Sequence, residues 1–271
     1  MNKKTIFVDL DGTLLNKDRK ISERNLDAIK RTKSLGYEII ISTGRGVSNS
    51  LEYADQIDSD YLMYSNGNIY DFKNKKIIYE NPMCKKELTM LYKSIENEPD
   101  IVCTFTCGGV RLFDKVPFTY HEPIVIQEPI IPWLSKNDVV QIIIYGKNTP
   151  HLRRIKDSIL PGLKTFVLSE CSNCMMDPLA TVAVGASFSF IGLTSHTSNK
   201  GNGIRMFCDM FNIPFENRVS IGDNFNDLPM LEHCAYNVAM GNAIDELKAR
   251  ADYITDTNDN DGVAKFLETL K

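Results

Sequence analysis

One short stretch near the N-terminus limits what this chain can fold into. Residues 7–15 read FVDLDGTLL, an apolar strand that runs into Asp9 and Asp11 and then into Gly12. In a strand the two carboxylates would share a face, but a turn at Gly12 lets the second one swing away from the first. An aspartate at a strand end can attack phosphorus and form an aspartyl-phosphate, while its neighbour handles protons. We therefore expect this stretch to be an active-site strand.

Such a nucleophile normally works beside a hard divalent cation. Mg²⁺ favours one or two carboxylates together with phosphate oxygens of the substrate, and Asp9 with a distant partner could supply the carboxylates. An ordinary strand followed by an Asp-Gly turn would explain part of the pattern. The five residues DLDGT together favour the catalytic interpretation.

Composition and charge narrow the class of protein. With 271 residues, 43% apolar and 24% charged, the chain can bury the core of one large domain or two modest ones. The net charge of −4 gives no electrostatic reason to expect nucleic acid or an anionic membrane as partner. There is no run of about eighteen apolar residues, and Lys3-Lys4 leads into a short strand rather than a signal peptide. We expect no membrane association and a cytoplasmic location.

Seven cysteines, an odd number without a secretory signal, predict reduced thiols. Four of them, Cys103, Cys107, Cys171 and Cys174, could meet as a zinc site, because the Cys-x₂-Cys spacing of the second pair is typical of such sites. The simpler interpretation is that they are buried thiols that pack as small hydrophobic side chains. A metal analysis of the purified protein would distinguish the two.

The chain continues as alternating helices and strands. A helix capped by Ser22 and ended by Gly36 precedes a strand over 37–43, which ends in Thr43-Gly44-Arg45-Gly46. This turn offers a hydroxyl and backbone N–H groups to an anion, and it leads into a helix predicted over 47–56. A third strand over 61–65 ends in Ser65-Asn66-Gly67, and a hairpin follows over 69–79.

The pattern changes between residues 82 and 189. Helical and strand segments alternate there without the regular β/α order, and prolines interrupt the middle around Trp133, whose side chain we expect in core or hinge packing. We interpret 82–189 as a separate α+β insert. Residues 1–81 and 190–271 then form an α/β core with a Rossmann-like, doubly wound parallel sheet.

The chain after the insert returns to the β/α pattern. Lys200 lies at the N-terminus of a helix with Ile204, Phe207 and Phe211 on one face, where a cation and the helix dipole both attract phosphate. A strand over 218–222 then delivers Asp223, followed by an acidic turn. Asp9, Thr43, Asn66 and Asp223 thus each end a predicted parallel strand, at the edge where open α/β sheets bind ligands.

These residues carry a family resemblance. DLDGTLL resembles the first motif of the haloacid dehalogenase superfamily, and the order DxD, Thr-Gly, Lys and Gly-Asp-x-x-x-Asp resembles its four successive motifs. The motifs TGR, SNG, KG and GDxxND are similar to those of the Cof-type subfamily. Its members are mainly Mg²⁺-dependent phosphatases of small phosphorylated metabolites, with an α+β cap inserted after the third core strand. The resemblance implies that 82–189 is such a cap and determines substrate specificity.

The resemblance also implies catalytic and metal-binding roles. Asp9 would be the nucleophile and a Mg²⁺ ligand. Asp11 would protonate the leaving oxygen and then deprotonate water, while its backbone carbonyl binds the metal. Asp223 would be the main remaining metal ligand, and Asp227 would orient Lys200 or a metal-bound water.

A further group of residues would hold the substrate. Thr43 and Lys200 would bind the transferring phosphoryl oxygens and stabilise their charge. Asn226 would contact phosphate or metal. The remaining contacts expected with the substrate or its phosphate are Leu10, Gly44, Arg45 and Asn66.

Two other functions stay open at this point. A phosphomutase, similar to phosphomannomutases, would return the phosphoryl group to a sugar hydroxyl instead of water. A non-catalytic protein that binds a phosphorylated metabolite would not need a nucleophile beside a proton shuttle, and a dehalogenase would leave Asp11 without a function. The sequence does not name the substrate; sugar phosphates, pyridoxal phosphate and flavin mononucleotide all fit.

Overall fold

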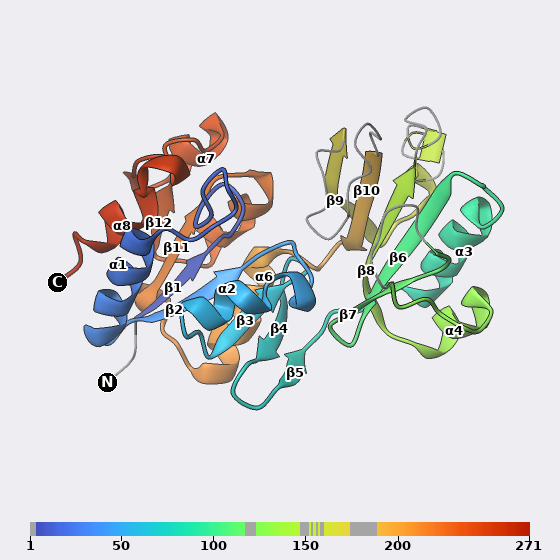
Figure 1. Cartoon of the computed structure of the whole chain (residues 1–271), viewed down its shortest axis with the longest axis horizontal. Coiled ribbons are helices and arrows are strands. Elements are labelled where there is room, and N and C mark those ends of the chain that lie inside the picture. Colours follow the sequence, from blue (N-terminus) through green and yellow to red (C-terminus); the bar gives the residue numbers. More distant parts are fainter. Residues whose placement is uncertain are drawn as a thin grey trace. The chain divides into compact units, whose positions relative to one another are not determined.

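The chain divides into two compact units, described here from a computed structural model (Figure 1). The structure describes residues 4–116, 123–146, 152, 154, 155, 157, 160–173 and 189–271. The first unit is Met1–Glu80 with Ser198–Lys271, and the second is Asn81–Thr197. Residues 190–197, which we had placed in the core, fall in the second unit because strand β10 (Ser189–Ser195) pairs there with β8 (Val139–Gly146) and β9 (Phe166–Asn173).

The first unit is built on an eight-stranded sheet. Its strands, in spatial order, are β13 (Tyr253–Ile254), β12 (Tyr236–Ala239), β11 (Arg218–Gly222), β1 (Thr5–Val8), β2 (Glu38–Ser42), β3 (Tyr61–Tyr64), β4 (Asn68–Asp71) and β5 (Lys76–Tyr79). The strands from β13 to β3 are parallel, and β4 and β5 add the predicted antiparallel hairpin. This confirms the α/β fold class. Strand order reverses at β1, which lies between β2 and β11, and ligands bind at such a switch point.

Helices and short 3₁₀ segments connect these strands. They are α1 (Glu23–Ser34), η1 (Val47–Asn49), α2 (Leu51–Gln56), α6 (Lys200–Phe211), η4 (Phe215–Asn217), η5 (Phe225–Glu232), α7 (Asp245–Arg250), η6 (Asn258–Asn260) and α8 (Gly262–Leu267). The Ser22 side chain caps α1 as expected, accepting a hydrogen bond from the N–H of Asn25. The single helix expected over 47–56 is instead two segments, η1 and α2. They separate at Ser50, whose hydroxyl donates to the carbonyl of Gly46.

Both faces of this sheet are buried. Helix α6 packs on the face that carries Phe7, Ile40 and Met63. Because side chains alternate along a strand, Ile6 and Ile39 point to the opposite face, and both are buried as well. Helices α1 and α8 pack side by side (Figure 1). The sheet is therefore covered on both sides, as its near-continuous apolar strands require.

The second unit has its own antiparallel sheet and core. Its strand order is β7 (Val110–Phe113), β6 (Ile101–Cys107), β8, β10, β9, accompanied by α3 (Lys85–Ile95), α4 (Ile130–Lys136) and η3 (Leu160–Gly162). Trp133 is buried in this core against Phe105, so it packs in the core rather than in a hinge. The role of the second unit in substrate specificity stays a prediction.

The zinc site considered for four cysteines is only partly covered by the described residues. Cys103 is buried in the core of the second unit. The Cys171 side chain and Cys174 lie outside the described residues, so the zinc site also stays a prediction. Within the described parts of the chain, no helix combines the length and apolar character needed to cross a membrane.

Candidate active site

The carboxylate of Asp9 lies at the sheet's switch point, directly after β1. Its backbone N–H donates to the carbonyl of Ile221 (3.0 Å) and its carbonyl accepts from the N–H of Leu14 (3.2 Å). Hydrogen bonds therefore fix both backbone polar groups of Asp9. Asp9 is 5% exposed, so its charge must be compensated by neighbours rather than by water.

Lys200 supplies that compensation from the first position of α6. The helix begins there because Asn199 caps it, accepting from the N–H of Asn202 (2.8 Å). Lys200 Nζ lies 2.5 Å from Asp9 Oδ1 and 2.6 Å from Asp227 Oδ1, and the side chain is fully buried. Burial alone would lower the pKa of this ammonium, but the two carboxylates outweigh it and raise the pKa. Lys200 therefore stays protonated.

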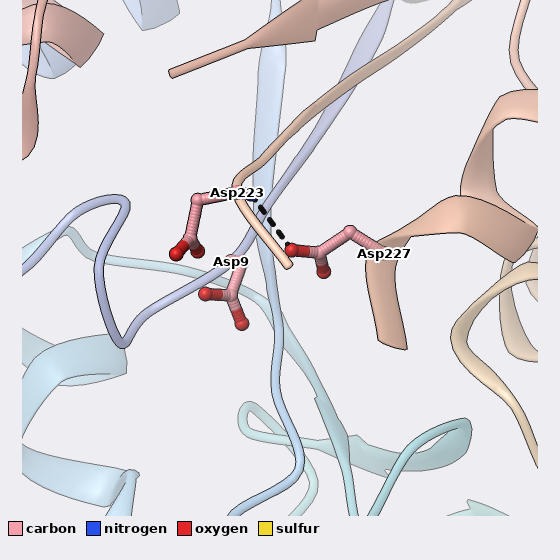
Figure 2. Close-up of side chains that lie close together, drawn as sticks. All are labelled: Asp9, Asp223 and Asp227. Atoms are coloured by element: carbon pink, nitrogen blue, oxygen red, sulfur yellow. Dashed lines mark hydrogen bonds between the residues drawn. The ribbon is translucent and has the colours of Figure 1, made fainter. Parts of the chain in front are cut away.

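Asp227 is held in place by the start of η5. Its Oδ2 accepts from the backbone N–H groups of Asp223 (2.8 Å, dashed in Figure 2) and Asn224 (3.0 Å). A Cβ at Gly222 would overlap this carboxyl group, so glycine is required there. Asp227 thus has one oxygen for the backbone and one for Lys200, which fits the expected role of orienting that lysine.

Asp223 directly follows β11, and its side chain contacts residues of the DLDGT motif. Its Oδ1 accepts from the Thr13 hydroxyl (2.9 Å). Gly12 has φ +80°, and a Cβ there would overlap the Asp223 carboxylate. The Gly-Thr pair that follows Asp11 therefore shapes the place where the second metal-ligand candidate lies. Burial first, and then the charge of Asp227, raise the pKa of Asp223 to about 6.

Three carboxylates converge on one point of the site. One oxygen each from Asp9, Asp223 and Asp227 lie within 4.8 Å of one another (Figure 2). Burial raises the pKa of Asp9 well above its ordinary value; Lys200 opposes this shift, while the charges of Asp227 and Asp223 add to it. The cluster thus holds more negative charge than one lysine balances.

This donor set fits a hard divalent cation, which prefers oxygen ligands. Both oxygens of Asp227 already accept hydrogen bonds. Among the described residues, Oδ2 of Asp9 and Oδ2 of Asp223 accept none. Asp9 and Asp223 therefore have oxygens available for a cation, whereas Asp227 has none, and their role as metal ligands stays a prediction. The Asp11 carboxylate is not part of this cluster.

Thr43 and Asn66 join the site from β2 and β3. Thr43 is buried, and its carbonyl accepts from the N–H of Asn66 (3.0 Å). Ser65 and Asn66 both have positive φ, 43° and 58°, so the Ser-Asn-Gly sequence forms a left-handed turn. A Cβ at Gly203 in the first turn of α6 would overlap the backbone of Gly67, so this turn packs directly on that helix. The turn and the Lys200 helix therefore form one surface.

The amide group of Asn66 is only partly used by the protein. Asn66 is 3% exposed, and its Oδ1 accepts from Asn226 Nδ2 at 3.3 Å. Its Nδ2 has no hydrogen-bond partner among the described residues. A buried unpaired N–H₂ is costly unless a ligand oxygen meets it, which fits the expected contact with phosphate.

Asp11 and Arg45 form a pair that the sequence did not predict. Arg45 Nε lies 2.7 Å from Asp11 Oδ2, and its second terminal nitrogen lies 2.5 Å from Asp11 Oδ1. Arg45 thus pairs with the acid–base candidate, and its expected contact with the substrate stays a prediction. Leu10 is buried directly after Asp9, and Gly44 directly follows Thr43, so both lie beside site residues.

The sequence analysis did not name three residues that support the site. Thr13 binds Asp223, and its position inside DLDGT was a usable signal. Asn224 caps η5, which carries Asp227, and its place before an acidic helix start was another. Asn242 Nδ2 donates to the carbonyl of Gly12 (2.8 Å) across 230 residues of sequence, and no local pattern marks that contact.

Comparison with known proteins places this geometry in a family. The model of the haloacid dehalogenase-like hydrolases matches residues 6–267. The 5-amino-6-(5-phospho-D-ribitylamino)uracil phosphatase YitU of Bacillus subtilis is 29% identical over 276 residues, covering 97% of this chain and 96% of YitU. The crystal structure of TM0651 from Thermotoga maritima superposes with a TM-score of 0.80 at 21% identity, covering 99% of this chain and 98% of that one. The HAD subclass IIB sugar phosphatase BT4131 gives a TM-score of 0.74 at 24% identity, covering 98% of each chain. The chain belongs to the haloacid dehalogenase-like hydrolase family.

Proposed function

We propose that this protein is a Mg²⁺-dependent phosphatase that hydrolyses a small phosphorylated metabolite through an aspartyl-phosphate on Asp9. The observation that carries the proposal is the arrangement of the buried Asp9 and Lys200 with the half-buried Asp223 at the switch point of the sheet. A protein that only binds phosphate has no use for a carboxylate at the centre of its anion site, because it repels the ligand. A phosphatase that forms an aspartyl-phosphate, in contrast, requires a carboxylate at this position.

The first half of the reaction forms the covalent intermediate. A carboxylate oxygen of Asp9 attacks phosphorus while the bond from phosphorus to the ester oxygen breaks. Asp11, two residues further on, gives its proton to the departing oxygen, so that an alcohol leaves rather than an alkoxide. The fixed backbone of Asp9 keeps the attacking oxygen in place during this step.

The second half releases phosphate. Asp11 takes a proton from water, the water oxygen bonds to phosphorus, and the bond between Asp9 and phosphorus breaks. In this proposal Lys200 Nζ and the Thr43 hydroxyl bind the phosphoryl oxygens, and Asn66 Nδ2, which has no hydrogen-bond partner among the described residues, adds a further donor. A Mg²⁺ ion held by Asp9, Asp223 and the carbonyl of Asp11 would supply positive charge to the phosphoryl oxygens.

The substrate class follows from the relatives. YitU is named as the phosphatase of a phosphorylated ribitylamino-uracil, and BT4131 is named a sugar phosphatase. We therefore place the substrate among sugar phosphates and phosphorylated cofactors or their precursors, with a phosphomonoester as the common group. Specificity within that class is assigned to the second unit, Asn81–Thr197.

The test is phosphate release from a panel of phosphomonoesters with and without Mg²⁺. The panel contains sugar phosphates, the phosphorylated ribitylamino-uracil, pyridoxal phosphate and flavin mononucleotide. We expect selective turnover that requires Mg²⁺ and is lost almost completely in Asp9→Asn, while a ³²P-labelled substrate marks wild-type Asp9. Full turnover by Asp9→Asn would refute the covalent mechanism. An isomerised sugar phosphate without free phosphate would identify a phosphomutase, and no reaction with any ester would favour a binding protein.

A further inference from the structure

The pair between Arg45 and Asp11 is built from unequal partners. The Arg45 side chain is 13% exposed, whereas that of Asp11 is 55% exposed. The more buried partner, Arg45, therefore determines where the carboxylate of Asp11 lies. A guanidinium that binds both oxygens of one carboxylate fixes its rotation as well as its distance, which a single hydrogen bond does not.

Arg45 is itself held on several sides. Another of its terminal nitrogens donates to the carbonyl of Asn49 (3.2 Å), and its guanidinium carbon lies 5.3 Å from the ring centroid of Tyr53. Tyr53 is buried and donates to the carbonyl of Arg19 (3.2 Å). Asn49 belongs to η1 and Tyr53 to α2, so the two segments that separate at Ser50 each contribute one contact to the guanidinium.

The backbone of Arg45 connects the same residue to the phosphate side of the site. Its N–H donates to the Thr43 hydroxyl (3.2 Å), and its carbonyl accepts from the N–H of Ser65 (2.8 Å). Arg45 therefore joins Thr43, the turn that carries Asn66, and Asp11. In this structure its guanidinium donates to a carboxylate and a carbonyl of the protein itself.

We propose that Arg45 is the positioning residue for Asp11, setting the orientation of the carboxyl group that exchanges protons with the leaving oxygen and with water. The inference rests on the proposed function, because it assigns Arg45 to the acid–base half of that reaction. It also replaces the expectation that Arg45 contacts the substrate's phosphate. A phosphate ligand and a positioning residue for the acid predict different kinetic losses.

The leaving group separates the two roles. An alkoxide needs a proton to depart, whereas p-nitrophenolate leaves without one, so in the first half of the reaction only the alkyl ester depends on a well-placed Asp11. The second half, in which Asp11 takes a proton from water, is the same for both esters, so the comparison uses kcat/KM, which reports the first half. We expect Arg45→Gln to lower kcat/KM about 10- to 100-fold for the best alkyl phosphomonoester, and less than about threefold for p-nitrophenyl phosphate, because positioning can remove only part of the acid–base contribution. Arg45→Lys keeps the charge without the two-pronged geometry and should remain defective toward the alkyl ester.

The matched control is Arg24→Gln. Arg24 makes an equally two-pronged pair with Glu268, at 2.9 and 2.8 Å, with both side chains nearly half exposed and outside the site. This variant should retain wild-type kcat/KM for both esters. In the Asp11→Asn background, Arg45→Gln should add no further loss, because the group it positions is already inactive.

The outcomes are distinct for the inference and for the proposed function. Equal loss of kcat/KM on both esters, or additive losses in the double variant, would overturn the positioning role of Arg45, with the phosphatase intact. A wild type that releases phosphate from no ester would overturn the proposed function and this inference with it.

Discussion

Replacing Lys200 by methionine removes the one ammonium between two buried carboxylates while keeping most of the side-chain volume. Asp9 and Asp227 would then lie unpaired in a region where Lys200 is fully buried and the carboxylates are nearly so. Removing one partner of a buried ion pair costs about 3–5 kcal/mol, because the remaining charge is left without compensation. We expect the free energy of unfolding of Lys200→Met to fall by about that amount at pH 7 in EDTA.

A surface pair of the same chemistry provides the control. Lys265 Nζ lies 2.6 Å from Asp256 Oδ2, the same separation as Lys200 from Asp227, but these side chains are 39% and 37% exposed. Lys265→Met should therefore change the unfolding free energy by no more than about 1 kcal/mol. Urea unfolding followed by circular dichroism measures both variants against the wild type.

The pH dependence tests the cause. A carboxyl group whose folded-state pKa lies above its unfolded value destabilises the folded state when it is ionised, so its penalty grows as the pH rises. The deficit of Lys200→Met should therefore shrink as the pH falls from 7 towards 5. A loss below about 1 kcal/mol, matching that of Lys265→Met, would show that burial does not make this lysine essential to stability.

Three further predictions concern the first motif. Asp11→Asn should lower kcat for an alkyl phosphomonoester by about 10²- to 10⁴-fold, measured by phosphate release; an unchanged kcat would remove Asp11 from the acid–base role. Thr13→Val removes the hydrogen bond to Asp223 and should raise the Mg²⁺ concentration for half-maximal activity by about tenfold; an unchanged Mg²⁺ titration would separate Thr13 from the metal site. Gly12→Ala should lower the unfolding free energy by more than about 1 kcal/mol, and by more than Gly36→Ala, because only at Gly12 would the new Cβ meet the Asp223 carboxylate; equal losses would leave backbone strain as the whole effect.

The residues at strand ends were predictable because the rule that locates them is local. A short apolar run predicts a buried parallel strand, and the residue after it lies at the carboxyl edge whatever the rest of the chain does. The structure brings Asp9 and Asp223 together by this rule, with Asp227 added from η5 and Lys200 from a helix N-terminus marked by its Asn199 cap.

The features that the sequence did not predict depend on contacts between distant segments, or on a side chain that competes with the backbone for a hydrogen bond. The pair between Arg45 and Asp11 joins two strand-end loops, and either residue alone is compatible with a contact to phosphate. The break at Ser50 arises because a serine hydroxyl competes with the helix for a backbone carbonyl, which hydrophobic spacing does not reveal. The end of the inserted unit was placed too early because β10 reads like a core strand until its antiparallel partners are known.

The central position of β1 has a consequence for when activity can first arise. Its two neighbours are β2, which follows closely in sequence, and β11, whose Arg218 pairs with Thr5. During synthesis, the strand that carries the nucleophile therefore waits with one edge unpaired while the whole inserted unit emerges from the ribosome. A nascent chain that ends before Asp223 lacks one of the proposed metal ligands and strands β12 and β13, so we expect it to have no phosphatase activity. We expect catalysis to begin only after the second segment of the first unit has emerged and paired with β1.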